Sequence, residues 1–207
     1  PLGWISGPNG RAIDFDGTGV IDTGASDIAD GLFCDAGREW SLLIKGRFAS
    51  NGSIIARAGN SATGRTFDLT HEDGEIAVRV RGAGTVLEEG YDGRHILVGL
   101  SWNGVVLSAY IDGDFVGYPG IGNADEEADQ RIIIGGRENG SGNILDDADI
   151  SYCYLFGRSL SGAEHKARFV SQPMETQDIS VSRIVGMSGE RRADADVVYT
   201  KGDQIIE

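Results

Sequence analysis

The sequence has little of the material that cross-links or stiffens a small protein. Only two cysteines and four prolines occur among its 207 residues. Cys34 and Cys153 are far apart in the chain and match no metal-binding spacing such as C-x2-C. They either form one long-range disulfide or are two separate buried thiols, and we favour the thiols because cysteine packs as a small hydrophobic residue. A chain of this length needs no such cross-link to fold as one ordinary domain with a short addition.

Long hydrophobic runs and positive charge are also scarce. No stretch approaches the ~18 consecutive apolar residues of a membrane span, and the first ten residues show no basic or apolar export-signal region. Eighteen basic residues face 32 acidic ones, for a net charge of −14. Such a surface repels the phosphate backbone of nucleic acids. We therefore expect no membrane span and no nucleic-acid partner.

Glycine is abundant, with 32 residues, and indicates many tight turns between short strands. Apolar residues at 96, 98, 100 and 102 fall on one face with a period of two, as in a half-buried strand, and Leu97 is the only large apolar residue between them. Asn103-Gly104 then favours a type I′ turn and a return strand over 105–111, and Asp112-Gly113 marks a second tight turn. Three consecutive antiparallel strands are predicted here.

The same pattern recurs along the chain, with predicted strands at 12–16, 19–23, 40–48, 53–58, 65–69, 75–81, 114–117, 131–135 and 150–156. Ser161 and Glu164 have the spacing of a capping box and predict a short helix over 161–170. A further helical turn is expected at 27–34. We predict an all-β antiparallel sandwich or jelly roll over residues 1–173, followed by a C-terminal extension or docking tail, 174–207, with at most a strand at 179–185.

Several of these runs resemble one family. They are Gly10–Gly17 with Gly19–Gly24, then Arg94–Gly117, Ile132–Gly136 and Asp149–Ser161, and they are similar to the laminin-G-like, concanavalin-A-like lectin and glucanase jelly rolls found in bacterial and phage proteins. The resemblance covers about residues 10–172 and implies an antiparallel concanavalin-A-like jelly roll. It is more specific for fold than for function.

Hydrolases of this resembled fold carry paired carboxylates in an E-x-D-x-E or E-x-D-x-x-E pattern on one strand, which suits acid and base chemistry across a glycosidic bond. No such pattern occurs here, because Glu72-Asp73-Gly74-Glu75 has the wrong spacing and falls at a predicted turn. The three histidines, His71, His95 and His165, lie in no zinc-protease motif. We expect a non-enzymatic protein, with a glycoside hydrolase as the least favoured alternative.

Two acidic runs, 125–129 and 146–149, could supply the oxygen ligands that Ca²⁺ prefers. Related jelly rolls often bind one Ca²⁺ near the rim of the sandwich. This resemblance implies a Ca²⁺ site at Asp146 and Asp147, joined by Asp16 or Asp22. Solvated loop carboxylates are the competing interpretation.

Some aromatic residues could stack on sugars, and glycine-rich loops could contact a partner. The candidate ligand-binding residues are Trp4, Tyr91, Tyr118, Arg137 and Asn139, with Tyr110 as a further aromatic candidate. Trp40 and Trp102 lie in alternating strands and are expected in the core.

These features favour a non-enzymatic binding or assembly module. Our leading hypothesis is a bacteriophage virion protein, a head decoration or tail-associated subunit with capsid or tail proteins as partners, present as a homo-oligomer or within a particle. The alternative is a Ca²⁺-dependent carbohydrate-binding module of a bacterial surface or secreted protein, which binds a host-surface glycan outside the cell.

Overall fold

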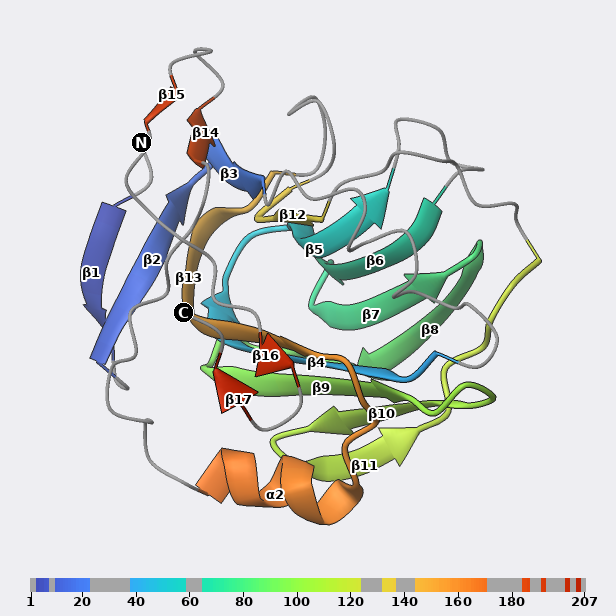
Figure 1. Cartoon of the computed structure of the whole chain (residues 1–207). Helices are drawn as coiled ribbons and strands as arrows, with labels where there is room; N and C mark the ends of the chain where they lie inside the picture. Colours follow the sequence, from blue (N-terminus) through green and yellow to red (C-terminus); the bar gives the residue numbers. More distant parts are fainter. Residues whose placement is uncertain are drawn as a thin grey trace.

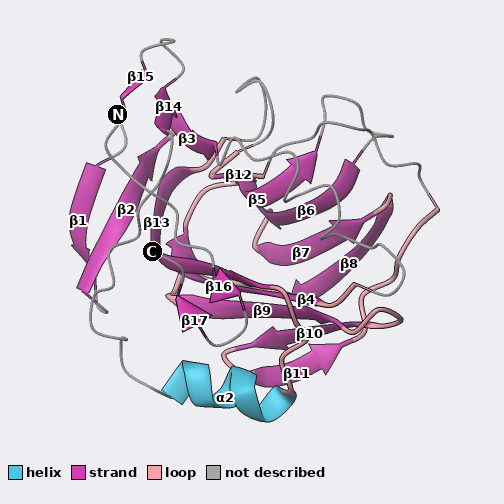
Figure 2. Cartoon of the chain, viewed as in Figure 1, coloured by secondary structure: helices cyan, strands magenta, loops and turns pink. Residues whose placement is uncertain are grey.

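The computed structural model describes residues 3–7, 10–22, 38–58, 65–123, 132–136 and 144–170, together with the backbone of 184–186, 191–192, 200–201 and 204–205; of residues 3–7, 10, 11, 58, 65 and 66 it also describes the backbone alone. Two sheets pack face to face around one hydrophobic core, and one helix lies outside them (Figures 1 and 2). The predicted all-β antiparallel sandwich is therefore confirmed. None of the described helices is long and apolar enough to cross a membrane.

The first sheet has every neighbouring pair antiparallel along its main path. Its order is β1 (Gly3–Gly7), β2 (Gly10–Asp16), β13 (Asp146–Phe156), β4 (Trp40–Phe48), β9 (Ile96–Trp102), β10 (Leu107–Ile111) and β11 (Asp114–Gly117). Strand β13 is next to β4 although about a hundred residues separate them in the chain. The last strand in this order, β11, forms one edge of the sheet.

The second sheet is also antiparallel. It runs in the order β15 (Arg191–Arg192), β14 (Ile184–Gly186), β3 (Gly19–Asp22), β12 (Ile133–Ile134), β5 (Gly52–Ala58), β6 (Arg65–Glu72), β7 (Glu75–Val80) and β8 (Ala83–Glu88). Short strands of the C-terminal extension join both sheets, because β14 pairs with β3 and β16 (Thr200–Lys201) pairs with β13 and with β17 (Gln204–Ile205). The domain boundary at residue 173 stays a prediction.

Tight turns connect the hairpins as their dipeptides favour. Both residues of Asp73-Gly74, Arg81-Gly82 and Asp112-Gly113 have positive φ, which is the requirement of a type I′ turn. The Asn103-Gly104 prediction was wrong in detail, since only Gly104 has a positive φ. The side-chain oxygen of Asn103 instead accepts hydrogen bonds from the amides of Val105 and Val106, so the turn is longer and β10 begins at Leu107.

The core lies between the inner faces of the two sheets. Its largest fully buried side chains include Trp40, Phe15, Phe48 and Phe67, with the rings of Trp40 and Phe67 in edge-to-face contact. Trp102 is also buried, as predicted. Cys153 is a free thiol that packs against this core, and burial raises its pKa to about 12. Cys34 and the predicted helical turn at 27–34 lie outside the described residues.

The helix α2 (Gly162–Val170) covers part of the outer face of the first sheet, below β9, β10 and β11 in Figure 1. Its capping box is formed as predicted, because Ser161 Oγ accepts from the Glu164 amide over 3.3 Å and the Ser161 amide donates to Glu164 Oε2 over 2.8 Å. A second small apolar cluster lies on this face and consists of Leu43, Leu97, Phe156 and Leu160. The edge strand of this sheet, β11, carries a further aromatic side chain, Phe115.

Candidate aromatic binding site

Two exposed aromatic rings lie at the edge of the first sheet. Phe115, on β11, is 51% exposed, and Tyr118, directly after that strand, is 68% exposed. Their ring centroids are 4.9 Å apart, with the planes inclined by 60°. Val116 between them is 43% exposed. We call Phe115, Val116 and Tyr118 the aromatic edge site.

Buried rings support this site from behind. Phe115 contacts Tyr110 at a centroid distance of 5.7 Å, and Tyr110 stacks on His165 of α2 at 4.0 Å with the planes only 15° apart. Tyr110 is 8% exposed and His165 is fully buried. The exposed pair is therefore the outer end of a row of four rings that begins under the helix.

Hydrogen bonds hold the chain that follows Tyr118. The amide of Gly120 donates to Thr85 Oγ1 over 3.1 Å, and the amide of Gly122 donates to the Val80 carbonyl over 3.0 Å. These bonds attach the segment after β11 to β7 and β8 of the second sheet. Backbone attachment of this kind positions a side chain before a ligand arrives and lowers the entropy lost on binding.

The neighbouring charges are paired. Arg94 bridges Glu88 at 2.8 Å and Asp112 at 2.7 Å, and Lys166 of α2 contacts Asp114 of β11 at 2.6 Å. Asp112 also accepts a hydrogen bond from the Leu97 amide. These pairs connect the edges of the two sheets and the helix around the aromatic edge site.

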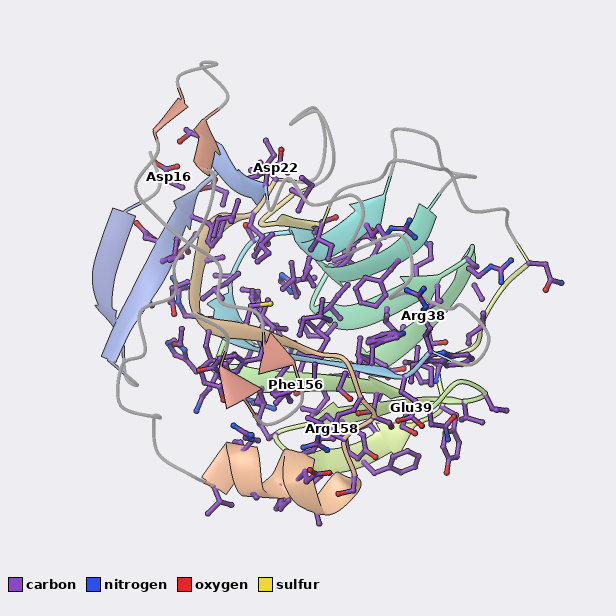
Figure 3. All side chains as sticks on the ribbon, viewed as in Figure 1. Asp16, Asp22, Arg38, Glu39, Phe156 and Arg158 are labelled. Atoms are coloured by element: carbon purple, nitrogen blue, oxygen red, sulfur yellow. The ribbon has the colours of Figure 1, made fainter. Side chains whose placement is uncertain are left out.

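The predicted calcium ligands are brought together only in part. Asp16 of β2 is directly opposite Asp146 of β13, and Gly17 packs against the Asp146 side chain. Asp16 Oδ1 accepts hydrogen bonds from the amide and hydroxyl of Thr18, at 3.1 and 2.5 Å. Figure 3 labels Asp16 beside β2 and Asp22 beside β3.

Asp22 and Asp147 do not join this pair. Asp22 belongs to the second sheet, opposite Ile133, and is 5% exposed. Asp147 contacts Arg47 Nη2 at 2.6 Å, and this hydrogen bond lowers the pKa of the Asp147 carboxyl. Among the described residues there is no group of three or more metal-ligating side chains. Asp16 and Asp146 are therefore adjacent, while Asp147 pairs with Arg47 and Asp22 lies in the other sheet, and the Ca²⁺ site stays a prediction.

Arg47 also binds a more deeply buried carboxylate. Its Nε lies 3.0 Å from Oδ2 of Asp149, whose side chain is 5% exposed. His95 Nε2 lies 3.5 Å from the other oxygen of Asp149. Arg47 is thus the cation that compensates two carboxylates of β13, and His95 lies beside this cluster.

The predicted sugar-contacting residues have different outcomes. Tyr118 is exposed as expected, whereas Tyr91 is only 6% exposed and cannot offer a ring to a ligand. The Tyr91 hydroxyl accepts from the Phe48 amide over 3.1 Å and donates to the Arg94 carbonyl. Burial raises the pKa of Tyr91 to about 12.

Tyr110 is likewise buried, and it supports the site instead of contacting solvent. Trp4 lies in β1 opposite Ile13, and only its backbone is described. Arg137 and Asn139 lie outside the described residues. Phe115 and Val116 were not predicted. No local signal marked them, because their exposure follows from the position of β11 at the edge of the sheet.

No protein-family model matches this sequence, and no curated protein sequence matches it. Solved structures do share its fold. The binding domain of Paraclostridial Mosquitocidal Protein 1 is 11% identical with a TM-score of 0.57, over 81% of this chain and 45% of that one. A Trypanosoma rangeli sialidase is 15% identical with a TM-score of 0.60, over 84% and 29%.

A structure of botulinum neurotoxin type C, described as dependent on two ganglioside molecules for cell entry, is 13% identical with a TM-score of 0.54, over 87% of this chain and 44% of that one. This chain spans less than half the length of each of these three proteins. At such low identity the likeness establishes the fold alone. The chain is similar to β-sandwich domains of toxins and sialidases.

Proposed function

We propose that this chain is a binding module that captures a carbohydrate at the aromatic edge site. The observation that carries the proposal is the exposed pair Phe115 and Tyr118, whose rings are 4.9 Å apart on a supported edge. The C–H bonds on one face of a pyranose ring form an apolar surface that packs on the electron-rich face of an aromatic ring. Two inclined rings offer two such contacts to one or two sugar units.

An exposed edge strand can pair with a strand of a second polypeptide, but several features of β11 disfavour such pairing. β11 has only four residues and begins with a charged one, Asp114. Its register with β10 shifts so that Val116 has no residue opposite it. Short length, charge and a bulge are features that prevent strand addition at sheet edges. A ligand that contacts side chains fits this edge better than one that adds a strand.

The negative net charge of the molecule favours uncharged over anionic carbohydrates as ligands. Eighteen basic against 32 acidic residues repel anionic ligands at long range. The cations Arg94 and Lys166 near the site are already paired with carboxylates. We therefore expect uncharged glycans to bind better than sulfated or sialylated ones.

Two of the structural neighbours support a binding module, without supporting the preference for uncharged glycans. One is a binding domain of a toxin, and another belongs to a neurotoxin whose cell entry is described as dependent on two ganglioside molecules. The bacteriophage virion role, with capsid or tail partners and assembly in a particle, stays a prediction, as do Ca²⁺ binding, the absence of enzymatic activity and the location outside the cell.

A glycan array with the whole chain identifies the ligand and tests the proposal. The Phe115→Ala and Tyr118→Ala variants should each lose binding, because each removes one stacking surface. Val105→Ala is the matched control, since Val105 is an exposed apolar residue, 78% exposed, in the separate turn between β9 and β10. The proposal is abandoned if the array shows no bound glycan, or if binding persists when both rings are removed.

A further inference from the structure

The helix α2 is attached to the sheet by an unusual residue. Of its nine residues only His165 is buried, while Phe169 and Val170 are 36% and 67% exposed. A helix on a sheet normally buries a stripe of apolar side chains. Here one imidazole takes the place of that apolar stripe. The packing of the helix on the sheet therefore depends on the protonation state of this ring.

The surroundings of the ring leave no room for rearrangement. One face of the imidazole stacks on Tyr110. Gly99 of β9 lies so close that a Cβ at that position would be 2.4 Å from His165 Nδ1. Ser101 Oγ lies 2.8 Å from His165 Nε2. The ring is held between β9, β10 and the helix.

A chain of hydroxyl groups determines which nitrogen of His165 carries the proton. Ser41 Oγ is 2.9 Å from the Arg158 carbonyl, which only accepts, so Ser41 donates its one hydrogen there. Ser101 Oγ must then donate to Ser41 Oγ across their 2.8 Å contact. Because the hydrogen of Ser101 is thereby used, His165 Nε2 must be the donor to Ser101 Oγ.

The other ring nitrogen is therefore unprotonated in the docked helix. Nδ1 of His165 is buried and has no hydrogen-bond partner in the described part of the chain. A second proton would be placed on this atom, against Gly99, with no acceptor to receive it. Burying an unpaired charge in this way is strongly unfavourable.

The charged and titratable groups on the elements around His165 are engaged elsewhere. On the helix and its N-terminal loop, Glu164 is bound to Arg158 and to Ser161, and Lys166 is bound to Asp114. Arg168 of α2 lies over the ring of Phe156, and Lys45 of β4 lies near the Phe169 ring. On the strands, Tyr110 contributes its ring face and Asp112 is bound to Arg94. None of these groups hydrogen-bonds Nδ1.

We propose that α2 is an acid-sensitive latch, in which protonation of His165 releases the helix from the first sheet while the sandwich stays folded. Release exposes the apolar cluster of Leu43, Leu97, Phe156 and Leu160, together with the ring of Tyr110. Acid thereby creates an apolar surface that is closed at neutral pH. Local release is expected to precede global unfolding because the main core lies on the opposite face of the sheet.

Amide hydrogen exchange on the whole chain between pH 7 and pH 4.5 tests the latch. The protection factors of α2 amides should fall at least about tenfold at the lower pH, while those of β4 and β9 amides stay high. His165→Gln should abolish the change, because its amide stays neutral and can donate to Ser101. His95→Gln is the matched control and should respond as the wild type does, since His95 lies directly before β9, beside Asp149 of β13.

A second measurement needs no variant and serves if His165→Gln does not fold. Nitrogen-15 NMR of the imidazoles reports the tautomer and the titration of His165 directly. The latch requires a neutral His165 at pH 7 with its proton on Nε2. A proton on Nδ1, a positively charged His165 at pH 7, or unchanged protection of α2 down to pH 4 would overturn the proposal.

Discussion

His165 lies flat against Tyr110, with ring centroids 4.0 Å apart, and this contact joins the only described helix to the strand behind the aromatic edge site. Tyr110 in turn contacts Phe115, which is exposed. One stacked pair and one edge-to-face pair of rings therefore connect a buried polar network to an exposed aromatic surface. The stability of the helix and the geometry of the site should depend on the same residues.

Replacing the supporting ring should cost far more stability than replacing the exposed rings. Tyr110→Ala should lower the free energy of unfolding by about 3 kcal/mol, as expected for truncation of a buried aromatic residue. Tyr118→Ala should change it by less than about 0.5 kcal/mol, because Tyr118 is 68% exposed. Urea denaturation of both variants measures the difference. Equal losses would mean that Tyr118 packs in solution as a core residue.

Stability should fall in mild acid because of His165. Burial lowers the pKa of its imidazole to about 4, from an ordinary value near 6.5. As pH falls from about 6.5 to 4, the unfolded chain binds a proton that the folded chain does not, so this contribution is present above pH 6.5 and is lost within that window. At pH 5 the loss should be about 2 kcal/mol relative to pH 7.

The measurement is the difference between wild type and His165→Gln in urea denaturation at pH 7 and pH 5. Glu164 does not interfere in this range. Its hydrogen bonds to Arg158 and Ser161 lower its pKa to about 2, so its contribution is lost only as pH falls below its ordinary value near 4.5. An identical pH dependence in the two proteins would contradict the assignment to His165.

Removal of Arg47 should destabilise the protein more than removal of its exposed partner Asp147. Arg47→Ala leaves Asp149, 5% exposed, without its cation and should cost about 2–3 kcal/mol. Asp147→Ala removes an exposed partner, 68% exposed, and should cost less than about 1 kcal/mol. Thermal or urea unfolding distinguishes the two. The same small effect of both substitutions would show that Asp149 does not depend on Arg47.

Gly99 should not tolerate a side chain, because the His165 ring of α2 occupies the space beside it. A methyl group there would meet the His165 ring at 2.4 Å, so Gly99→Ala should displace α2 and increase hydrogen exchange of its amides. Gly84→Ala in β8 is a suitable control, since its added carbon would have an ordinary contact of 3.9 Å with Arg79. Comparable exchange of α2 amides in the two variants would show that the helix tolerates a side chain at residue 99.

Local sequence signals predicted the regular parts of this fold. Alternation identified β9, and the β4 prediction over 40–48 has the observed bounds. The capping box located α2 to within one residue because its hydrogen bonds join residues three apart in the chain. β8 was missed because its sequence, Ala-Gly-Thr-Val-Leu-Glu, has low strand propensity, and the Arg81-Gly82 turn with pairing to β7 supplies its stability.

The burial or exposure of the site residues could not be predicted from local patterns, because it depends on tertiary contacts. Tyr91 lies among polar residues in the sequence, which is typical of an exposed aromatic residue. In the fold its hydroxyl has two backbone hydrogen-bond partners and its ring is buried. Phe115 is exposed because β11 is an edge strand, which follows from the sheet order alone. His165 is buried because Ser101 and Tyr110, far away in sequence, meet it across the sheet.

The central claim is that Phe115 and Tyr118 bind a carbohydrate. Isothermal titration calorimetry of the best glycan from an array, against wild type, the Phe115→Ala/Tyr118→Ala double variant and the Val105→Ala control, tests it most directly. We predict that the double variant binds at least about tenfold more weakly, which is about 1.4 kcal/mol, while the control binds as the wild type does. Equal affinity of the double variant and the wild type would contradict the claim.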